Sequence, residues 1–131
     1  MFRFTLFVVS LSTFLCYGQT NLVDIKPDRE FENILIKEIS KDSLQSNFVI
    51  WIKHSVPAHY HQEHTETIYV LEGKGEMSLG ATSMDIKPGD FIVIVPNTIH
   101  SVTKVKGKKP LKVLSTQAPL FEGNDRILVK P

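Results

Sequence analysis

Short runs of apolar residues, separated by turn residues, follow one another along the chain from position 34 onward. The runs are rich in Val, Ile, Phe, Tyr and Thr, the residue types that favour strands. Gly and Pro occupy the breaks, as in Pro88-Gly89-Asp90, where Gly adopts backbone conformations that other residues avoid. This spacing predicts an all-β barrel or double-sheet jelly roll. The predicted strands are 34–39, 48–54, 65–72, 75–79, 82–87, 91–95, 100–105 and 111–117.

The order of apolar and polar residues within two of these runs predicts which side chains face the interior. In the run 48–54 the even positions are apolar as far as Ile52, so Ile50 and Ile52 are expected to face one side of the sheet. The run 91–95 is apolar at every position. That pattern predicts a strand buried on both faces.

The N-terminus, residues 1–18, has the pattern of a secretory signal peptide. The apolar run after Arg3 is too short for a membrane-spanning helix, which needs roughly 20 residues. We expect cleavage before Gln19, which makes the protein secreted or periplasmic, with no membrane attachment after cleavage. An uncleaved anchor and a buried first element are the alternatives. Lipidation at Cys16 is disfavoured, because the bulky Leu15 stands where a small residue is expected.

Length, charge and cysteine content exclude several classes of protein. A chain of 131 residues forms one ordinary domain. Its 15 basic and 14 acidic residues leave a formal charge of +1, which disfavours a nucleic-acid partner. A single Cys rules out an internal disulfide framework. The unusual feature is the group of five His residues, four of which lie between positions 54 and 64.

These histidines include a candidate metal site. In a strand, His59 and His61 point to the same face, so their imidazoles can converge on one ion. Glu66 follows closely enough to add a carboxylate from the next strand, and His100 is the one His after position 64. Three imidazoles and a carboxylate suit Mn, Fe, Ni, Cu or Zn, with positions open for water or substrate. His64 is an alternative ligand to Glu66, but the strand spacing favours Glu66.

Two histidines are expected to be bystanders. His54 precedes the cluster and is interpreted as a strand-end residue. Glu63 and His64 lie in the turn between the ligand-bearing strands and are expected to be solvated.

The spacing of the candidate ligands resembles that of a known superfamily. The pattern His59-x-His61-x4-Glu66-x6-Gly73 resembles the first motif of the cupins, and Gly89-x5-Val95-x-Asn97-x2-His100 resembles the second. The resemblance covers about residues 48–117. It implies a small single-domain cupin, with a cupin-type double-stranded β-helix that holds one divalent metal ion.

The chain departs from the cupin motifs at four places that are not metal ligands. Lys53 stands at the opening Gly of the first motif, Val95 at the Pro and Lys104 at the closing Asn of the second. Asn97 replaces the Gly of the second motif and tolerates left-handed backbone geometry better than most residues. These changes affect the loops and leave the metal site intact.

The resemblance also implies the domain division and the lining of a substrate pocket. Residues 19–33 form a lead-in segment, residues 34–118 the barrel, and residues 119–131 a tail that packs near the barrel mouth. Pocket residues are expected at positions that share strand parity with the ligands, and in the tail. These residues are Ile68, Val70, Val102, Lys104 and Arg126.

The superfamily supports many reactions on one scaffold, so the resemblance does not select one. The favoured hypothesis is an enzyme acting on a small oxygen-rich substrate such as a sugar or sugar acid, by isomerase- or tautomerase-type chemistry in polysaccharide breakdown. A metal-dependent dioxygenase is the second hypothesis, and a non-catalytic module that binds a small ligand is the third. The resemblance further implies a homodimer.

Overall fold

The computed structural model describes residues 18–130, so the predicted signal peptide lies, except for Gly18, outside the described residues. Within this range no helix has the length and apolar character needed to cross a membrane. The described chain folds into ten strands. They are β1 (Ile34–Lys41), β2 (Ser46–Ile52), β3 (Val56–Tyr60), β4 (Thr65–Glu72), β5 (Lys74–Leu79), β6 (Thr82–Ile86), β7 (Phe91–Ile94), β8 (His100–Lys106), β9 (Leu111–Ala118) and β10 (Ile127–Leu128).

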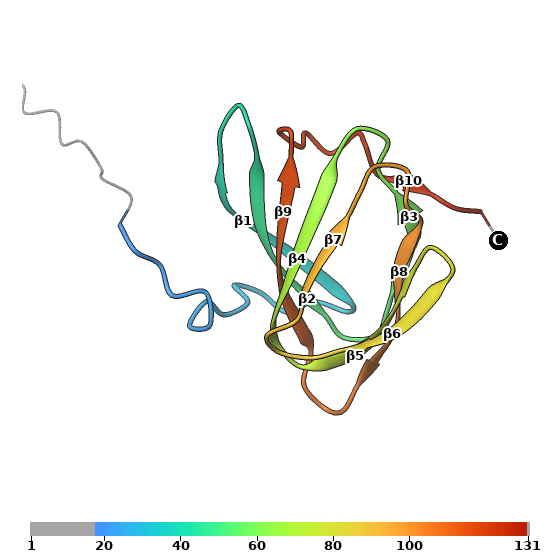
Figure 1. Cartoon of the computed structure of the whole chain (residues 1–131). Coiled ribbons are helices and arrows are strands. Elements are labelled where there is room, and N and C mark those ends of the chain that lie inside the picture. The colour runs from blue at the N-terminus through green and yellow to red at the C-terminus, as the bar shows by residue number, and fades with distance from the viewer. Residues whose placement is uncertain (1–17, 131) are drawn as a thin grey trace, which may run out of the picture.

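The strands form two five-stranded sheets that face each other (Figure 1). One sheet has the order β1-β2-β9-β4-β7 and the other β10-β3-β8-β5-β6, and the paired strands are antiparallel. Side chains from both sheets, among them Ile68, Val102 and Val113, form the core between them. The prediction of an all-β double-stranded β-helix is confirmed.

Each of the eight predicted strands corresponds to a strand of the structure, and two further strands are present. The first is β3, which contains His59, and the second is β10, which lies in the tail. β10 pairs with β3, so that Ile127 lies opposite Tyr60 and Leu128 opposite His59. The tail therefore returns to the sheet that carries the histidines.

The prediction that the run 91–95 is buried on both faces is wrong. Ile92 and Ile94 are buried in the core, but Phe91, Val93 and Val95 are 66%, 50% and 58% exposed. The physical reason is that successive side chains of β7 point to opposite faces of its sheet, and one of these faces is turned to the core. Its outer face is covered by no other described part of the chain.

The lead-in segment packs on the outer face of β2 and β1. Trp51, on the opposite face of β2 from Ile50 and Ile52, packs with Leu22, Ile25 and Phe31 among others. The side chain of Lys112 on β9 is buried beneath this segment, and its Nζ donates hydrogen bonds to the carbonyls of Leu22, Val23 and Ile25 at 2.7, 2.9 and 2.8 Å. One lysine thereby ties the lead-in segment to the barrel.

Gly73 links β4 to β5 at a place where no side chain fits. Its φ is +79°, in the left-handed region that favours glycine. A Cβ at this position would lie 2.5 Å from the carbonyl oxygen of Pro110 and 2.8 Å from the Cα of Leu111. The close approach of two backbone segments explains why the motif needs Gly here.

Candidate metal centre

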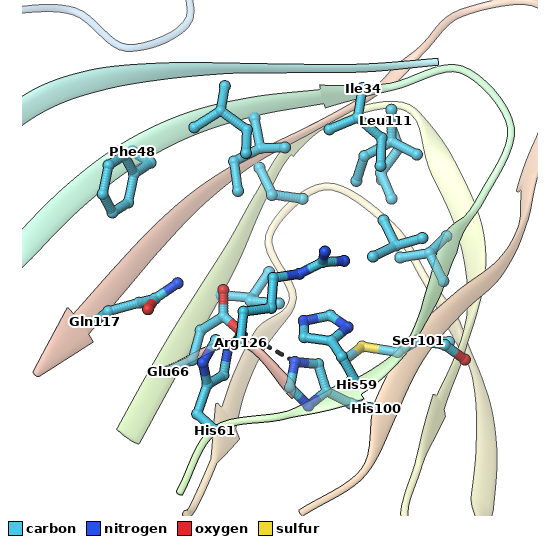
Figure 2. A pocket seen from close by; sticks show the side chains of 18 of the residues that line it. Ile34, Phe48, His59, His61, Glu66, His100, Ser101, Leu111, Gln117 and Arg126 are labelled. Atoms are coloured by element: carbon cyan, nitrogen blue, oxygen red, sulfur yellow. Dashed lines mark hydrogen bonds and ion pairs between the residues drawn. The ribbon is translucent and has the colours of Figure 1, made fainter. Parts of the chain in front are cut away.

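The four predicted ligands come from three regions of the fold and meet at one end of the space between the sheets (Figure 2). His59 lies on β3, His61 just after its end, Glu66 on β4 and His100 at the start of β8. All four are buried, with exposures of 3–6%. One nitrogen or oxygen of each lies within 4.8 Å of the others. The structure therefore brings together a group that could hold a metal ion.

Backbone carbonyls orient all three imidazoles. The Nδ1–H of His59 donates to the carbonyl of Pro57 at 2.8 Å, and that of His100 to the carbonyl of Thr98 at 2.9 Å. The Nδ1–H of His61 donates to the carbonyl of Asp125. Because a carbonyl only accepts, each Nδ1 carries the proton, and in the neutral ring each Nε2 keeps its lone pair. Metal-binding histidines are commonly held in this way.

Glu66 faces these nitrogens with one carboxylate oxygen and is held by the other. Its Oε1 accepts a hydrogen bond from the hydroxyl of Ser115 on β9. Its Oε2 lies 3.2 Å from Nε2 of His100 and 3.6 Å from Nε2 of His61. Lone pairs of oxygen and nitrogen thus point at each other, which is unfavourable unless a proton or a metal cation lies between them. His61 Nε2 is moreover buried without a hydrogen-bond partner among residues 18–130. The donor set fits a divalent cation.

The pKa values of the cluster favour an ionised Glu66 and a neutral His59, and they allow a proton to compete with a metal ion at His61. Burial lowers the pKa of His59 to about 4, which keeps this imidazole neutral near pH 7. For Glu66, burial opposes ionisation, but the neighbouring imidazoles of His100 and His61 and the hydroxyl of Ser115 outweigh it and hold the pKa well below its usual range. For His61, burial is outweighed by the neighbouring Glu66 carboxylate, and the pKa is raised. The centre is a carboxylate surrounded by imidazoles.

Asp125 connects the tail to the ligand loop, which is the segment 61–64 between β3 and β4 that carries His61. Its carboxylate accepts the backbone N–H groups of Gln62, Glu63 and His64 at 2.8, 3.0 and 3.2 Å. The same carboxylate lies 2.5 Å from Nδ1 of His64. Its main-chain carbonyl accepts from His61. The Asp125 side chain thus fixes the loop that carries His61, and its backbone orients the ring.

The expectation that His64 is solvated is wrong. The residue is 4% exposed, and its Nε2 lies 3.0 Å from the carbonyl of Leu120. Its ring also packs edge-on against Phe121. The tail, whose return could not be read from local spacing, covers this histidine. Glu63 is exposed, as expected, and so is His54, which lies just after the end of β2.

A cavity of about 260 Å³ opens beside the four ligands. Most of its wall consists of aliphatic side chains from both sheets, with Phe48 and Phe121 on the side of the tail. Ile68, Val102 and Arg126 line it, as do Ile50 and Ile52. In Figure 2 the side chain of Arg126 extends into the cavity close to His59 and Glu66.

Val70 and Lys104 do not line the cavity, contrary to expectation. Val70 faces the interior but is packed inside the core and is 1% exposed. Lys104 is exposed because a β-bulge interrupts β8. On the neighbouring strand β5, Met77 lies opposite Val102 and Glu76 lies opposite Lys104. One step along β5 therefore corresponds to two steps along β8. The bulge breaks the parity that Lys104 would otherwise share with His100.

Two functional positions, Ser115 and Gln117, were missed from the sequence, and a third, Asp125, was not linked to the loop that carries His61. Ser115 bonds to Glu66, Gln117 lines the cavity beside it, and Asp125 organises the ligand loop. Ser115 and Gln117 share the inward parity of Val113 on β9, which would have placed them in the interior. Asn97 takes the left-handed conformation expected for it, with φ +64°, and its N–H donates to the carbonyl of His61 at 2.6 Å.

Comparison with known proteins decides the family. Residues 48–117 match the family described as Cupin domain. The chain belongs to the cupin family. An uncharacterised protein of Aquifex aeolicus is 31% identical to this cupin over 99 residues, which cover 76% of this chain and 80% of the relative. The fold, the single domain and the clustered histidines agree with that membership.

Other relatives of this cupin are similar over shorter stretches or in fold alone. Quercetin 2,3-dioxygenase of Bacillus subtilis is 46% identical over 43 residues, which cover 33% of this chain but 13% of the dioxygenase. A solved structure from Klebsiella pneumoniae, a protein with a double-stranded β-helix domain, superposes with a TM-score of 0.70 at 20% identity, covering 87% of this chain and 99% of that one. The structural likeness supports the fold.

Proposed function

We propose that this cupin is an enzyme that binds one divalent transition-metal ion through His59, His61, Glu66 and His100. The observation that carries the proposal is the orientation of the three imidazoles: each Nδ1–H is bound to a carbonyl, which leaves each Nε2 as the nitrogen able to bind a metal ion. The bound ion, whether Mn, Fe, Ni, Cu or Zn, would supply Lewis acidity and positions for substrate oxygens.

The residues around the centre perform the remaining tasks. Ser115 holds Glu66, and the carbonyls of Pro57, Thr98 and Asp125 keep the imidazoles in place. The aliphatic walls exclude water, which strengthens electrostatic interactions inside the cavity. The substrate is therefore a small molecule that offers oxygen atoms at one end of an apolar cavity.

We propose a dioxygenase as the first candidate activity. Two observations support it: the apolar cavity suits a substrate with few hydroxyl groups together with O₂, and part of the chain is similar to a quercetin dioxygenase. A sugar-acid isomerase or tautomerase is the second candidate. It is favoured by Arg126 and Gln117, which could hold a carboxylate and a hydroxyl group.

Metal analysis and O₂ uptake test these proposals. We expect the purified protein to hold close to one metal ion per chain, and Glu66→Gln and His100→Ala to lose it. His54→Gln, which changes an exposed histidine, serves as the control. Substrate-dependent O₂ consumption supports the dioxygenase, whereas turnover without O₂ uptake supports the isomerase. Stoichiometric metal in both ligand variants would refute the assignment of the centre, and ligand binding without turnover would show a binding module.

Export and dimerisation are further proposals. Cleavage before Gln19 is tested by the mass of the mature protein in the secreted or periplasmic fraction. A homodimer is supported by the exposed apolar side chains of Phe91 and Val93 on the edge strand β7. Light scattering is expected to give twice the chain mass, and Val93→Ser to lower it. A single-chain mass for the unaltered protein would contradict the dimer.

A further inference from the structure

The cavity beside the metal centre has polar groups at one end and an apolar remainder. The four metal-site residues, Arg126 and Gln117 lie together, with Glu66 pairing opposite Gln117 in the sheet. Beyond them the wall is built from side chains such as Ile52, Met77 and Leu111, which offer no hydrogen bond. A ligand that fills this space must have the same division between polar and apolar parts.

Arg126 supplies an unbalanced positive charge at the polar end. Among residues 18–130, no carboxylate lies within salt-bridge distance of its guanidinium. The backbone on either side is fixed, because Asp125 is bonded to the ligand loop and Ile127 pairs with Tyr60. Arg126 is itself exposed, and its guanidinium at the cavity presents a planar pair of donors that matches a carboxylate. Burial lowers the pKa of Arg126 and the charge of Glu66 opposes this shift, so the guanidinium stays charged near neutral pH.

Gln117 supplies a second polar group that lacks a partner. The residue is 6% exposed, and its Oε1 is buried with no hydrogen-bond partner within the described chain. Leaving such a group unsatisfied costs roughly 1–3 kcal/mol. A hydroxyl or amide group of a ligand in the cavity would remove this cost.

The volume of the cavity limits the size of the apolar part. A cavity of about 150 Å³ in another protein accommodates benzene. At about 260 Å³, this cavity holds one six-membered ring with two small substituents. A sugar of similar size fits less well, because each hydroxyl placed against the aliphatic wall would lose its hydrogen bonds to water, at roughly 1–3 kcal/mol each.

We propose that the substrate is a small monocarboxylate with a compact apolar body and a hydroxyl or oxo group beside the carboxylate. Its carboxylate pairs with Arg126, a hydroxyl group donates to Gln117, and its apolar body packs between the sheets. This substrate class rests on the proposed function for the metal end of the site. The contacts with Arg126 and Gln117 belong to the protein alone and can be measured without metal.

Calorimetric titration of the full chain, metal-free and metal-loaded, tests the proposal with three probes. Salicylate has the ring, the hydroxyl group and the carboxylate; salicylamide lacks the charge; and glucuronate has a carboxylate on a hydroxylated body. We expect salicylate to bind at least about tenfold more tightly than either of the others, since a hydrogen bond to a charged group contributes about 1.5–3 kcal/mol.

Two variants locate the binding groups. We expect Arg126→Gln to weaken salicylate binding about 10- to 100-fold and to leave salicylamide binding unchanged. Arg126→Lys keeps the charge but loses the planar pair of donors, and should lie between the two. Arg29→Gln, which changes an exposed arginine on the lead-in segment, is the matched control. Gln117→Met should weaken the binding of both hydroxylated aromatic probes.

The outcomes separate this inference from the proposed function. Tighter binding of glucuronate than of salicylate, or equal binding of salicylate to Arg126→Gln and to the unaltered protein, would overturn the substrate class even if the protein holds metal. Dependence of salicylate binding on Arg126 in the metal-free protein would uphold the substrate class even if elemental analysis finds no metal. Folding of each variant is checked by its circular dichroism, and if Arg126→Gln fails this check, Arg126→Lys decides.

Discussion

The contacts of Asp125 lead to a quantitative prediction for the substitution Asp125→Asn. The carboxylate accepts one N–H with Oδ1, from Gln62, and meets the other three groups with Oδ2. An amide that places its single oxygen at the Oδ2 position loses the bond to Gln62 and sets two donors against each other. One hydrogen bond to a charged group contributes about 1.5–3 kcal/mol, and we expect a loss of unfolding free energy of that size.

Urea unfolding in the presence of a chelator measures this loss. With a dependence on urea of about 2 kcal/mol per M, typical of a small protein, the midpoint should fall by about 1 M. Glu122→Gln is the matched control, because it neutralises an exposed carboxylate in the same tail. Metal affinity should also fall, by about tenfold or more, because the loop that carries His61 is no longer fixed.

The difference in stability between the unaltered protein and Asp125→Asn should depend on pH, and the direction in which the pKa of Asp125 is shifted gives the sign. For Asp125, burial opposes ionisation, but the hydrogen bonds from His64 and the loop amides hold the pKa well below its usual range. A carboxyl group with a lowered pKa stabilises the folded state above its unfolded pKa of about 3.9, and this stabilisation is lost as the pH falls below that value. The gap between the unaltered protein and Asp125→Asn should therefore shrink on acidification below about pH 4. Equal midpoints of the two proteins at neutral pH would refute the reasoning.

Three further predictions concern other parts of the molecule. Metal affinity, measured by competition with a chelator, should fall on acidification, because the pKa of His61 is raised and a proton there competes with the ion; the slope approaches about tenfold per pH unit once His61 is protonated in the metal-free protein. A flat profile would contradict this. Gly73→Ala should destabilise the fold by more than the roughly 1 kcal/mol expected for Gly123→Ala, since both have positive φ but only Gly73 has backbone within 3 Å of a new Cβ; equal thermal shifts would contradict the steric explanation. Lys112→Met should speed proteolysis within the lead-in segment, with Lys109→Met, an exposed site, unchanged; equal cleavage rates would show that the lysine does not hold this segment.

Local spacing was sufficient to predict most strands of the barrel and the convergence of His59 and His61. The alternation of side chains brings His59 and His61 to one face, and the turn residues define the strands on which Glu66 and His100 lie. The convergence of His59 and His61 depends on neighbouring positions alone. His100 is distant in sequence and was included as the one His after position 64 and through the resemblance to the second cupin motif.

Errors arose where the answer depends on contacts between distant segments. Lys104 leaves the cavity because of a bulge opposite Glu76, and a bulge is a property of two paired strands. His64 is buried by a tail that follows it by more than fifty residues along the chain. Phe91 is exposed because no other described segment covers the outer face of β7, which an apolar run does not reveal.

The bond between His61 and the carbonyl of Asp125 has a consequence for how this protein tolerates change. Every amino acid at position 125 has a carbonyl, so this bond is indifferent to the identity of the residue. It depends instead on the number of residues between the end of β9 and the start of β10, which brings that carbonyl opposite the imidazole. We therefore expect insertions and deletions within 119–124 to disrupt the metal centre, whereas most substitutions at those positions should not. The length of this connection is the property that the protein must keep.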